Sequence, residues 1–375
     1  MDGYGTQRVD TVVIGGGQAG LAIGYHLRKQ GRPFVILDAD ARIGDSWRRR
    51  WDSLLLFTPA RYASLPGGRF PGRGSRFPTK DELADYLESY ATRFSLPVQN
   101  GAFVDRLWRE GDRFMVSAGG RLFEAENVVV ATGANRLPRT PAFADQLDPE
   151  IVQLHSAAYR HPSQLREGSV LVVGAGNSGA DISIEVAREH RTWLSGSEVA
   201  HVPFRIETWV ARNVLVRLVR FVGVHVLTLR TPFGRKAREG FVKGGTIVVR
   251  VKPNDIAAAG IARVPKVTGV RDGSPVLEDG QVLDVANVIW CTGFRQDFSW
   301  IDLPIFDESG AVAHDRGVVP AEPGLFFLGL PFQFAAASDT LPGVGRDAAY
   351  VAKRLARSKG RSPSTRTDGL RASTR

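Results

Sequence analysis

The sequence is almost free of cysteine, since Cys291 is the only one among 375 residues. A single thiol cannot form a disulfide within the chain, so the sequence excludes a disulfide-stabilised fold and an enzyme with a redox-active cysteine pair. Long apolar runs are missing too. The uncharged stretch Pro323–Ser338 contains two prolines and is shorter than the roughly 18 to 20 apolar residues that cross a membrane. No transmembrane segment is therefore predicted.

A secretory signal is also missing from the first ten residues, MDGYGTQRVD, which carry acidic residues where a signal peptide is basic. This favours a cytoplasmic protein. The formal net charge is +10, but the tail from Arg357 to Arg375 holds six basic residues against one acidic residue, and its composition predicts disorder. Because no zinc-finger spacing or RNA-binding aromatic motif accompanies the charge, we expect no nucleic-acid partner. No metal-ligand cluster is evident, and no metal is predicted.

What the sequence does contain is one motif twice. The first copy consists, in order, of a strand, three glycines, a helix, a second strand and an acid: Thr11–Ile14, Gly15, Gly17, Gly20, residues 19–30, residues 33–37 and Asp38. This order is typical of a unit that binds a dinucleotide. The first glycine permits a tight turn, the second lets a pyrophosphate approach the backbone, and the third lets helix and strand pack closely. The acid stands where a carboxylate accepts hydrogen bonds from a ribose diol.

A shift of 159 residues lays a second copy on the first. The corresponding glycines are Gly174, Gly176 and Gly179, and the second strand is Thr192–Ser195. Ser197 takes the place of Asp38, so this copy lacks the acid that would hold an unphosphorylated ribose, which favours NADPH over NADH. Glu198, an acid next to Ser197, disfavours the additional phosphate of NADPH. Arg205 is a candidate partner for that phosphate.

Two different nucleotide sites in one chain indicate hydride transfer from a nicotinamide to a second redox nucleotide such as a flavin. We therefore expect FAD at the first copy and NADPH at the second. Two further strands, NVVVATG at 127–133 and NVIWCTG at 287–293, bracket the second copy. They predict an α/β fold of two Rossmann-like domains, with the NADPH-binding domain inserted in the FAD-binding domain. The expected segments are 1–135 and 288–357 for FAD, 136–164 for a linker, 165–287 for NADPH and 358–375 for the tail.

Two other stretches have a helical pattern. Thr79 and Glu82 form a capping box ahead of an apolar stripe that ends at Phe94, which predicts a scaffold helix facing the core. The apolar stretch Trp209–Arg230 contains four arginines, and it could lie on a membrane surface or cover a substrate cavity. Because the arginines do not gather on one helical face, we expect a cover over the nicotinamide domain.

With both glycine motifs, both ATG-like strand ends and the stretch GDSWRRRW placed, the chain resembles the flavin-containing monooxygenases. The resemblance is strongest to the bacterial and plant YUCCA-like branch of these class B flavoprotein monooxygenases. It covers residues 8 to 356, roughly. It implies FAD contacts at Gly15, Gly17, Gln18, Ala19, Gly20, Asp38, Gly44, Trp47, Arg48 and Val104. It implies NADPH contacts at Gly174, Gly176, Asn177, Ser178 and Gly179, to which the motif comparison adds Ser197 and Arg205.

The chain departs from this family at two places. Of the family's linker signature, His155 and Tyr159 are present, whereas Pro149 and Ile151 occupy the Phe and Gly positions. His155 is interpreted as a hinge residue. The stretch FTPARYASLPG lacks the Asn that many members place near the flavin, and Tyr62 is the candidate to replace it.

The resemblance implies a monooxygenase in which NADPH reduces FAD and O₂ then gives a C4a-peroxyflavin that transfers one oxygen atom to a small organic substrate. The cofactor carries this chemistry, so no dedicated catalytic side chain is needed. Two alternatives remain open from the residues alone. One is an NAD(P)H-dependent flavin oxidoreductase or oxidase without oxygenation, and the other is a non-catalytic flavoprotein that senses redox state.

Overall fold

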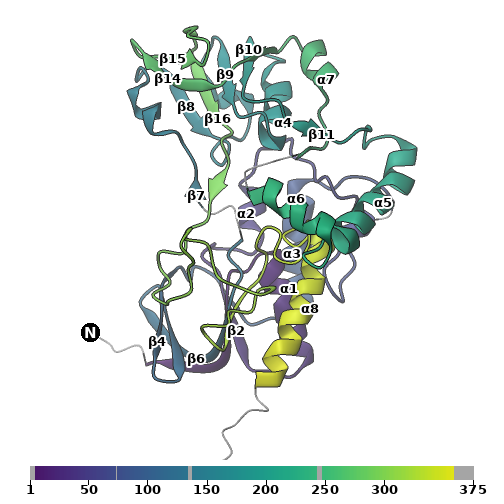
Figure 1. The fold of residues 1–375 in the computed structure, drawn as a ribbon, viewed down its shortest axis with the longest axis vertical. Coiled ribbons are helices and arrows are strands. Elements are labelled where there is room, and N and C mark those ends of the chain that lie inside the picture. The colour runs from purple at the N-terminus through teal and green to yellow at the C-terminus, as the bar shows by residue number, and fades with distance from the viewer. Residues whose placement is uncertain (1–4, 73, 134–136, 243–246, 359–375) are drawn as a thin grey trace, which may run out of the picture.

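The computed structural model describes residues 5–72, 74–133, 137–242 and 247–358. The described residues form two large β-sheets with helices packed on them, one in the lower and one in the upper half of Figure 1. Each sheet contains one of the two glycine motifs. The two Rossmann-like α/β units predicted from the sequence are confirmed.

The first sheet has the strand order β3-β2-β1-β6-β5-β4, and β18 also pairs with β6. Its strands are β1 (Gln7–Ile14), β2 (Phe34–Leu37), β3 (Val98–Gln99), β4 (Val104–Glu110), β5 (Arg113–Ala118), β6 (Arg121–Val130) and β18 (Leu325–Phe327). β1 is parallel to β2 and β6, whereas β4, β5 and β6 are antiparallel. After the second unit, the chain comes back to the first sheet and adds β18 beside β6.

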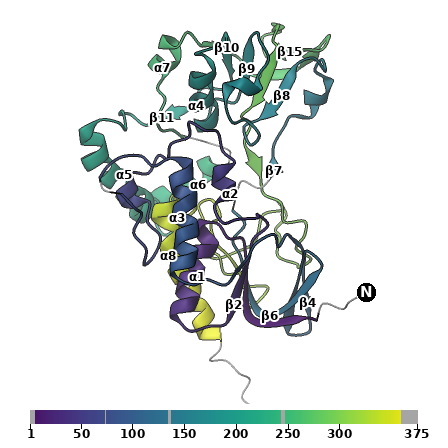
Figure 2. The same ribbon diagram turned by 180° about the vertical axis from the view of Figure 1, so that it is seen from behind.

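The core of this unit follows from the alternation of side chains along β1. Val13 packs on one face among residues of three helices, α1 (Gln18–Lys29), α3 (Lys80–Arg93) and α8 (Leu341–Ser358). Val12 and Ile14 pack on the other face against the antiparallel strands. Figure 2 shows the three helices side by side on their face of the sheet. The capping box predicted for α3 is confirmed, since the Thr79 and Glu82 side chains each accept a hydrogen bond from the other's backbone N–H.

The second sheet is entirely parallel, in the order β13-β10-β9-β16-β8. Its strands are β8 (Val152–His155), β9 (Val170–Val173), β10 (Thr192–Ser195), β13 (Ala262–Val264) and β16 (Asn287–Trp290), and its helices are α4 (Asn177–Val186) and α7 (Pro253–Ala258). Residues 152–155 were expected to be linker, and that prediction is wrong. Their backbone pairs with β16 over four residues, so the second unit begins before residue 165.

Short elements complete the chain. Pairs of short strands are β11 (Ala200–His201) with β12 (Ile247–Val248), and β14 (Val267–Arg271) with β15 (Ser274–Leu277). The brief helices are α2 (Asp45–Arg48), η1 (Ala60–Tyr62), η2 (Ala142–Gln146) and η3 (Pro162–Gln164). The two crossings between the units, β7 (Leu137–Pro138) and β17 (Phe294–Arg295), pair with each other as an antiparallel ribbon. Figure 1 shows β7 between the two sheets, so this ribbon is the connection between the units.

The stretch expected to cover the nicotinamide domain lies elsewhere. It consists of the π-helical turns η4 (Ala211–Leu215) and η5 (Val222–Val226) on either side of α5 (Val216–Phe221), followed by α6 (Pro232–Val242). Asn213 accepts a hydrogen bond from Arg61 and the Val224 carbonyl accepts one from Arg346, and both donors belong to the first unit. These helices therefore pack on the first unit, although their residues fall in the segment expected to bind NADPH. No helix among the described residues is both long enough and apolar enough to span a bilayer.

Candidate cofactor sites

The first glycine loop joins β1 to α1, and its three glycines differ in whether the surrounding chain leaves room for a side chain. Gly15 has φ +108°, and a Cβ there would lie 2.6 Å from the Ala131 carbonyl oxygen. A Cβ on Gly20 would lie 1.8 Å from the Gly15 oxygen, whereas a Cβ on Gly17 would meet no atom within 4 Å. The chain's own packing thus requires two of the glycines. Gly17, by contrast, leaves open space at the N-terminus of α1, where unpaired amides and the helix dipole favour an anion.

The second loop repeats this geometry. Gly174 has φ +111°, and a Cβ on Gly179 would again lie 1.8 Å from the oxygen of the loop's first glycine. The residue before each helix has nearly the same backbone angles, φ −74° and ψ −170° at Gly17 and φ −73° and ψ −171° at Gly176. A Cβ on Gly174 would lie 2.3 Å from the Cys291 oxygen, the counterpart of Ala131. The two ATG-like strand ends, at Ala131 and Cys291, therefore pack directly against the two glycine turns. The sequence did not reveal this role.

Asp38 lies at the end of β2, beside the first loop. Its carboxylate accepts hydrogen bonds from the Gly16 N–H and, at 2.9 Å, from the Asp40 N–H. Burial raises the pKa of Asp38 above its usual value. The Gln99 Oε1 atom, on the strand whose backbone pairs with Asp38, is buried without a hydrogen-bond partner among the described residues. A buried acceptor such as Gln99 Oε1, which lacks a donor, fits the hydroxyl group of a ribose.

The segment that leads to Val104 lies at the same edge. The Ala102 N–H donates to the Asp38 carbonyl at 2.8 Å, and Val104 itself is buried at the start of β4. Gly16, which the sequence analysis did not single out, is a further part of the site. A Cβ on Gly16 would lie 2.6 Å from the Asp38 carboxylate, so this position also excludes a side chain.

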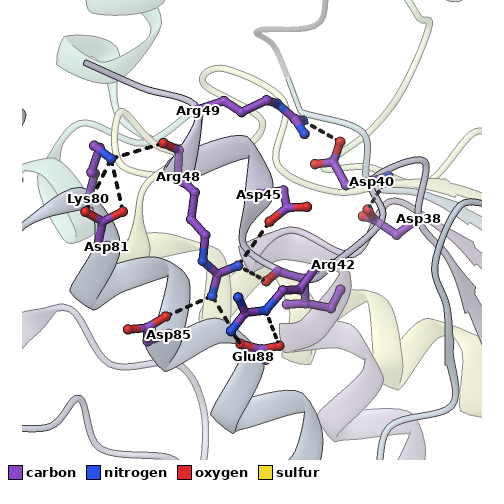
Figure 3. A network of polar contacts seen from close by, with 11 residues as sticks. Asp38, Asp40, Arg42, Asp45, Arg48, Arg49, Lys80, Asp81, Asp85 and Glu88 are labelled. Atoms are coloured by element: carbon purple, nitrogen blue, oxygen red, sulfur yellow. Dashed lines mark hydrogen bonds and ion pairs between the residues drawn. The ribbon is translucent and has the colours of Figure 1, made fainter. Parts of the chain in front are cut away.

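The loop after Asp38 is held on α3 by charge (Figure 3). Gly44 has φ +92°, and a Cβ there would lie 2.7 Å from the Ala84 oxygen, so α2 starts directly against α3. Arg48 was expected to contact FAD. Its guanidinium instead donates to the Ile43 carbonyl at 2.8 Å, to Asp85 at 2.8 Å and to Glu88 at 3.1 Å. Trp47 packs against the core of the first unit. Arg48 thus positions the loop, and a contact with FAD stays a prediction.

Other predicted residues also hold the chain in place. The Gln18 side chain donates to the Asp339 carbonyl at 2.6 Å, and Ala19 is buried behind it. Asn177 donates to the Ile247 carbonyl and accepts from the Val249 N–H, both at 2.9 Å. Ser178 follows in the first turn of α4. These contacts hold the segment at Asp339 beside the N-terminus of α1 and the segment at residues 247–249 beside the N-terminus of α4.

The end of β10 differs from the expectation. Arg205, predicted to meet the additional phosphate of NADPH, is paired with Asp255 on α7 at 2.7 Å. The basic residue that the structure brings to Ser197 is Arg263 on the neighbouring strand β13, whose guanidinium donates to the Gly196 carbonyl at 3.1 Å and to the Ser197 carbonyl at 3.3 Å. Burial lowers the pKa of Arg263, and the charge of Glu198 partly opposes that shift. Sequence reasoning missed Arg263 because only the sheet brings the two positions together.

His155 fits its predicted place at the connection. Its Nε2–H donates to the Gly293 carbonyl at 3.0 Å, and its Nδ1 accepts from the Ala157 N–H at 3.1 Å, so the ring is neutral. Burial, followed by the charge of Arg50, lowers its pKa. Tyr159 is buried in the second unit and donates to Glu185 at 2.9 Å. Tyr62 lies beside α5, with the Arg220 guanidinium 5.3 Å from its ring centre.

The segment after α2 connects the two units. Trp51 is buried in the core of the second unit, and the Asp52 N–H donates to the Arg160 carbonyl at 2.9 Å. Arg250 of the second unit donates to the Leu56 carbonyl at 3.0 Å. Arg250 also attracts the charge of Asp181 on α4, yet burial raises the pKa of Asp181 to about 6. No motif in the sequence indicated this partly buried acid.

Comparisons with known proteins agree with this geometry. The profile of the pyridine nucleotide-disulphide oxidoreductase family matches residues 12–220. A flavin-containing monooxygenase from Stenotrophomonas maltophilia is 32% identical, with a TM-score of 0.77, over 94% of this chain and 100% of that one. The chain belongs to the flavin-containing monooxygenase family. An uncharacterised CzcO-like oxidoreductase from Geobacillus kaustophilus is 40% identical over 92% of this chain and 97% of its own. Arabidopsis thaliana YUCCA9, a probable indole-3-pyruvate monooxygenase, is 27% identical over 80% and 78%.

Membership in the family makes the protein an oxidoreductase, and FAD and NADPH are the family's cofactors. The geometry of both glycine loops fits a bound dinucleotide, as does the Gln99 Oε1 atom near Asp38, which has no hydrogen-bond partner among the described residues. Disulfide chemistry gives the broader family its name, and this sequence has one cysteine, Cys291. Burial also raises the pKa of the Cys291 thiol.

The contrast between Gly17 and Gly20 makes a first prediction. Gly20→Ala should lower the stability of the fold by about 3 kcal/mol, because its Cβ would overlap a backbone oxygen. Gly17→Ala should keep the melting temperature of the apoprotein but weaken FAD binding at least about tenfold, because its methyl group enters open space that a pyrophosphate would fill. Thermal melts and FAD titrations measure both. Loss of stability in Gly17→Ala with unchanged FAD affinity would contradict this division.

The neutral His155 makes a second prediction. Since the folded state lowers the pKa below 6.5, the unfolded chain takes up the proton first, and stability is lost as the pH falls below 6.5. In His155→Gln, the drop in melting temperature between neutral and mildly acidic pH should be smaller than in the wild type by about 1 °C. An identical pH dependence of the two proteins would show that His155 does not contribute.

Proposed function

We propose that the protein is an NADPH-dependent FAD monooxygenase that adds one oxygen atom from O₂ to a small organic substrate. The observation that carries this proposal is the pair of glycine loops with the same backbone geometry but different second strands. One strand is followed by the partly buried acid Asp38, and the other is followed by Ser197, whose carbonyl accepts a hydrogen bond from Arg263. Two loops of one shape with different ribose environments favour two different dinucleotides.

For FAD we propose the residues of the first loop and its surroundings. The set is Gly15, Gly17, Gln18, Ala19, Gly20, Asp38, Gly44, Trp47, Arg48 and Val104, with Gly16 added by its hydrogen bond to Asp38. The α1 amides would hold the pyrophosphate and Asp38 the ribose. The flavin supplies the redox and oxygen chemistry when bound. The protein's part is to bind, to orient and to exclude water.

For NADPH we propose the second loop. The set is Gly174, Gly176, Asn177, Ser178, Gly179 and Ser197, and the phosphate on the adenosine ribose is read by Arg263 in preference to Arg205. An exposed Arg205 would have to give up Asp255, whereas the contacts of Arg263 are to neutral carbonyl oxygens. The His155 hinge and the β7–β17 ribbon would set how the second unit approaches the first.

Arg263 and Arg205 can be separated by substitution. Arg263→Ala should raise the KM for NADPH about tenfold and leave the KM for NADH unchanged, because an arginine–phosphate pair is lost. Arg205→Ala is the matched control and should change neither value appreciably. Steady-state kinetics with both coenzymes measure this. A raised KM for NADPH in Arg205→Ala alone would restore the assignment made from the sequence.

Oxygenation can be separated from simple oxidase activity. With a tertiary amine, an organic sulfide or a 2-keto acid present, a substrate of the enzyme should lower the H₂O₂ released per NADPH consumed and should acquire one atom of heavy oxygen from labelled O₂. An oxidase would instead release one H₂O₂ per NADPH with every compound. NADPH turnover well below about 1 per second under all conditions would favour a non-catalytic sensor.

A further inference from the structure

Helices η4, α5 and α6 leave a large apolar surface uncovered. Two aromatic side chains are almost fully exposed, Trp209 at 74% and Phe233 at 73%. Around them, Val210, Val214, Leu218, Val219 and Phe221 are each more than half exposed. We call residues 209–221 and 230–240 the apolar–basic surface. Single exposed apolar side chains are ordinary, but seven of them on two neighbouring helices mark an interaction site.

The same surface carries a concentrated positive charge. Residues 209–240 contain seven basic residues against one acidic residue, Glu239. Six of the basic side chains are exposed: Arg217, Arg220, Arg230, Arg235, Lys236 and Arg238. Outside this stretch and the tail from Arg357, acidic and basic residues are nearly equal in number. The net charge outside the tail is therefore concentrated on the apolar–basic surface.

The other side of these helices is fixed to the first unit. Ala211 and Val224 are buried, and Arg61 donates to Asn213 at 2.5 Å. The Ala337 N–H donates to the Gly223 carbonyl at 3.3 Å. In both Figure 1 and Figure 2, α5 lies at the outer edge of the molecule, away from both sheets. The exposed side chains therefore face outward from an anchored element rather than from a fraying end.

We propose that the apolar–basic surface docks the protein on an anionic lipid bilayer. Large apolar side chains, a tryptophan and surrounding cations are the features with which helices bind in the interfacial region of a membrane. Each cation near an anionic surface adds to the binding, so the charge complements such a bilayer. A second copy of the chain fits less well, because a two-fold axis would bring the same cations together. The occupant we infer is the lipid headgroup layer.

Flotation of the purified holoprotein with lipid vesicles tests this proposal. We expect the protein to float with phosphatidylcholine vesicles that contain about a third phosphatidylglycerol and to stay behind with pure phosphatidylcholine. Raising the salt from about 0.1 M to about 1 M should weaken binding, since charge contributes. Failure to float with the anionic vesicles at low salt would overturn the proposal.

Two variants test each contribution separately. The triple substitution Trp209→Ser, Leu218→Ser and Phe221→Ser should lower the partition coefficient at least about tenfold. Arg217→Glu combined with Lys236→Glu should do the same at low salt. Both remove exposed side chains, and retained FAD and an unchanged melting temperature confirm that the variants fold.

Phe306→Ser is the matched control. It removes an exposed aromatic ring from the segment next to β4, which lies far from α5 in both ribbon views, and should bind vesicles as the wild type does. Equal flotation of the triple variant and the wild type would overturn the proposal. So would a triple variant that floats normally but changes from dimer to monomer in solution, because the surface would then be occupied by a second copy.

Discussion

The close approach of helix and strand at the third glycine of each loop governs the rest of the structure. A Cβ at Gly20 or Gly179 would lie 1.8 Å from a backbone oxygen, so neither position accepts a side chain. This approach sets the helix N-terminus directly after the turn, where its free amides lie beside Gly17 or Gly176. Because both loops obey the same constraint, we expect the two proposed pyrophosphate sites to be alike. In the proposed function, the two cofactors are therefore distinguished at the ends of the second strands, by Asp38 and Ser197.

A second constraint is electrostatic, and it sets where the two units meet. Arg42 and Arg48 share Glu88, which holds the loop after Asp38 on α3 (Figure 3). Exposed pairs of this kind contribute at most about 1 kcal/mol each, but they restrict a segment with little regular structure. That segment continues to Trp51, which is buried in the core of the second unit. The loop beside the predicted flavin site and the contact between the units are thus one continuous piece of chain.

The sequence predicted those features that depend on local chemistry. The glycine turns, the bounds of β10 and the capping box of α3 each follow from neighbouring residues, and the structure has them where expected. β16 starts where expected, but it ends at Trp290 and belongs to the second sheet, although residues from 288 on were assigned to the first unit. Prediction from the sequence failed where segments distant along the chain pair with each other. β8 is a strand only because it pairs with β16, and Arg263 reaches Ser197 only because β13 lies beside β10. An arginine 66 positions from its partner gives no signal in a search for nearby basic residues.

The surface helices show a different reason for failure. An amphipathic face was rejected for Trp209–Arg230 because the arginines do not gather at a period of 3.6 residues, the period of an α-helix. The structure places a π-helical turn on each side of α5, and such turns close their hydrogen bonds from i to i+5. The rotation per residue therefore changes twice within the stretch, and exposed Val210, Val214 and Leu218 recur every four residues. A helical wheel assumes one constant rotation per residue. It therefore spreads these exposed side chains around the helix, whereas in the folded chain they lie on one exposed side.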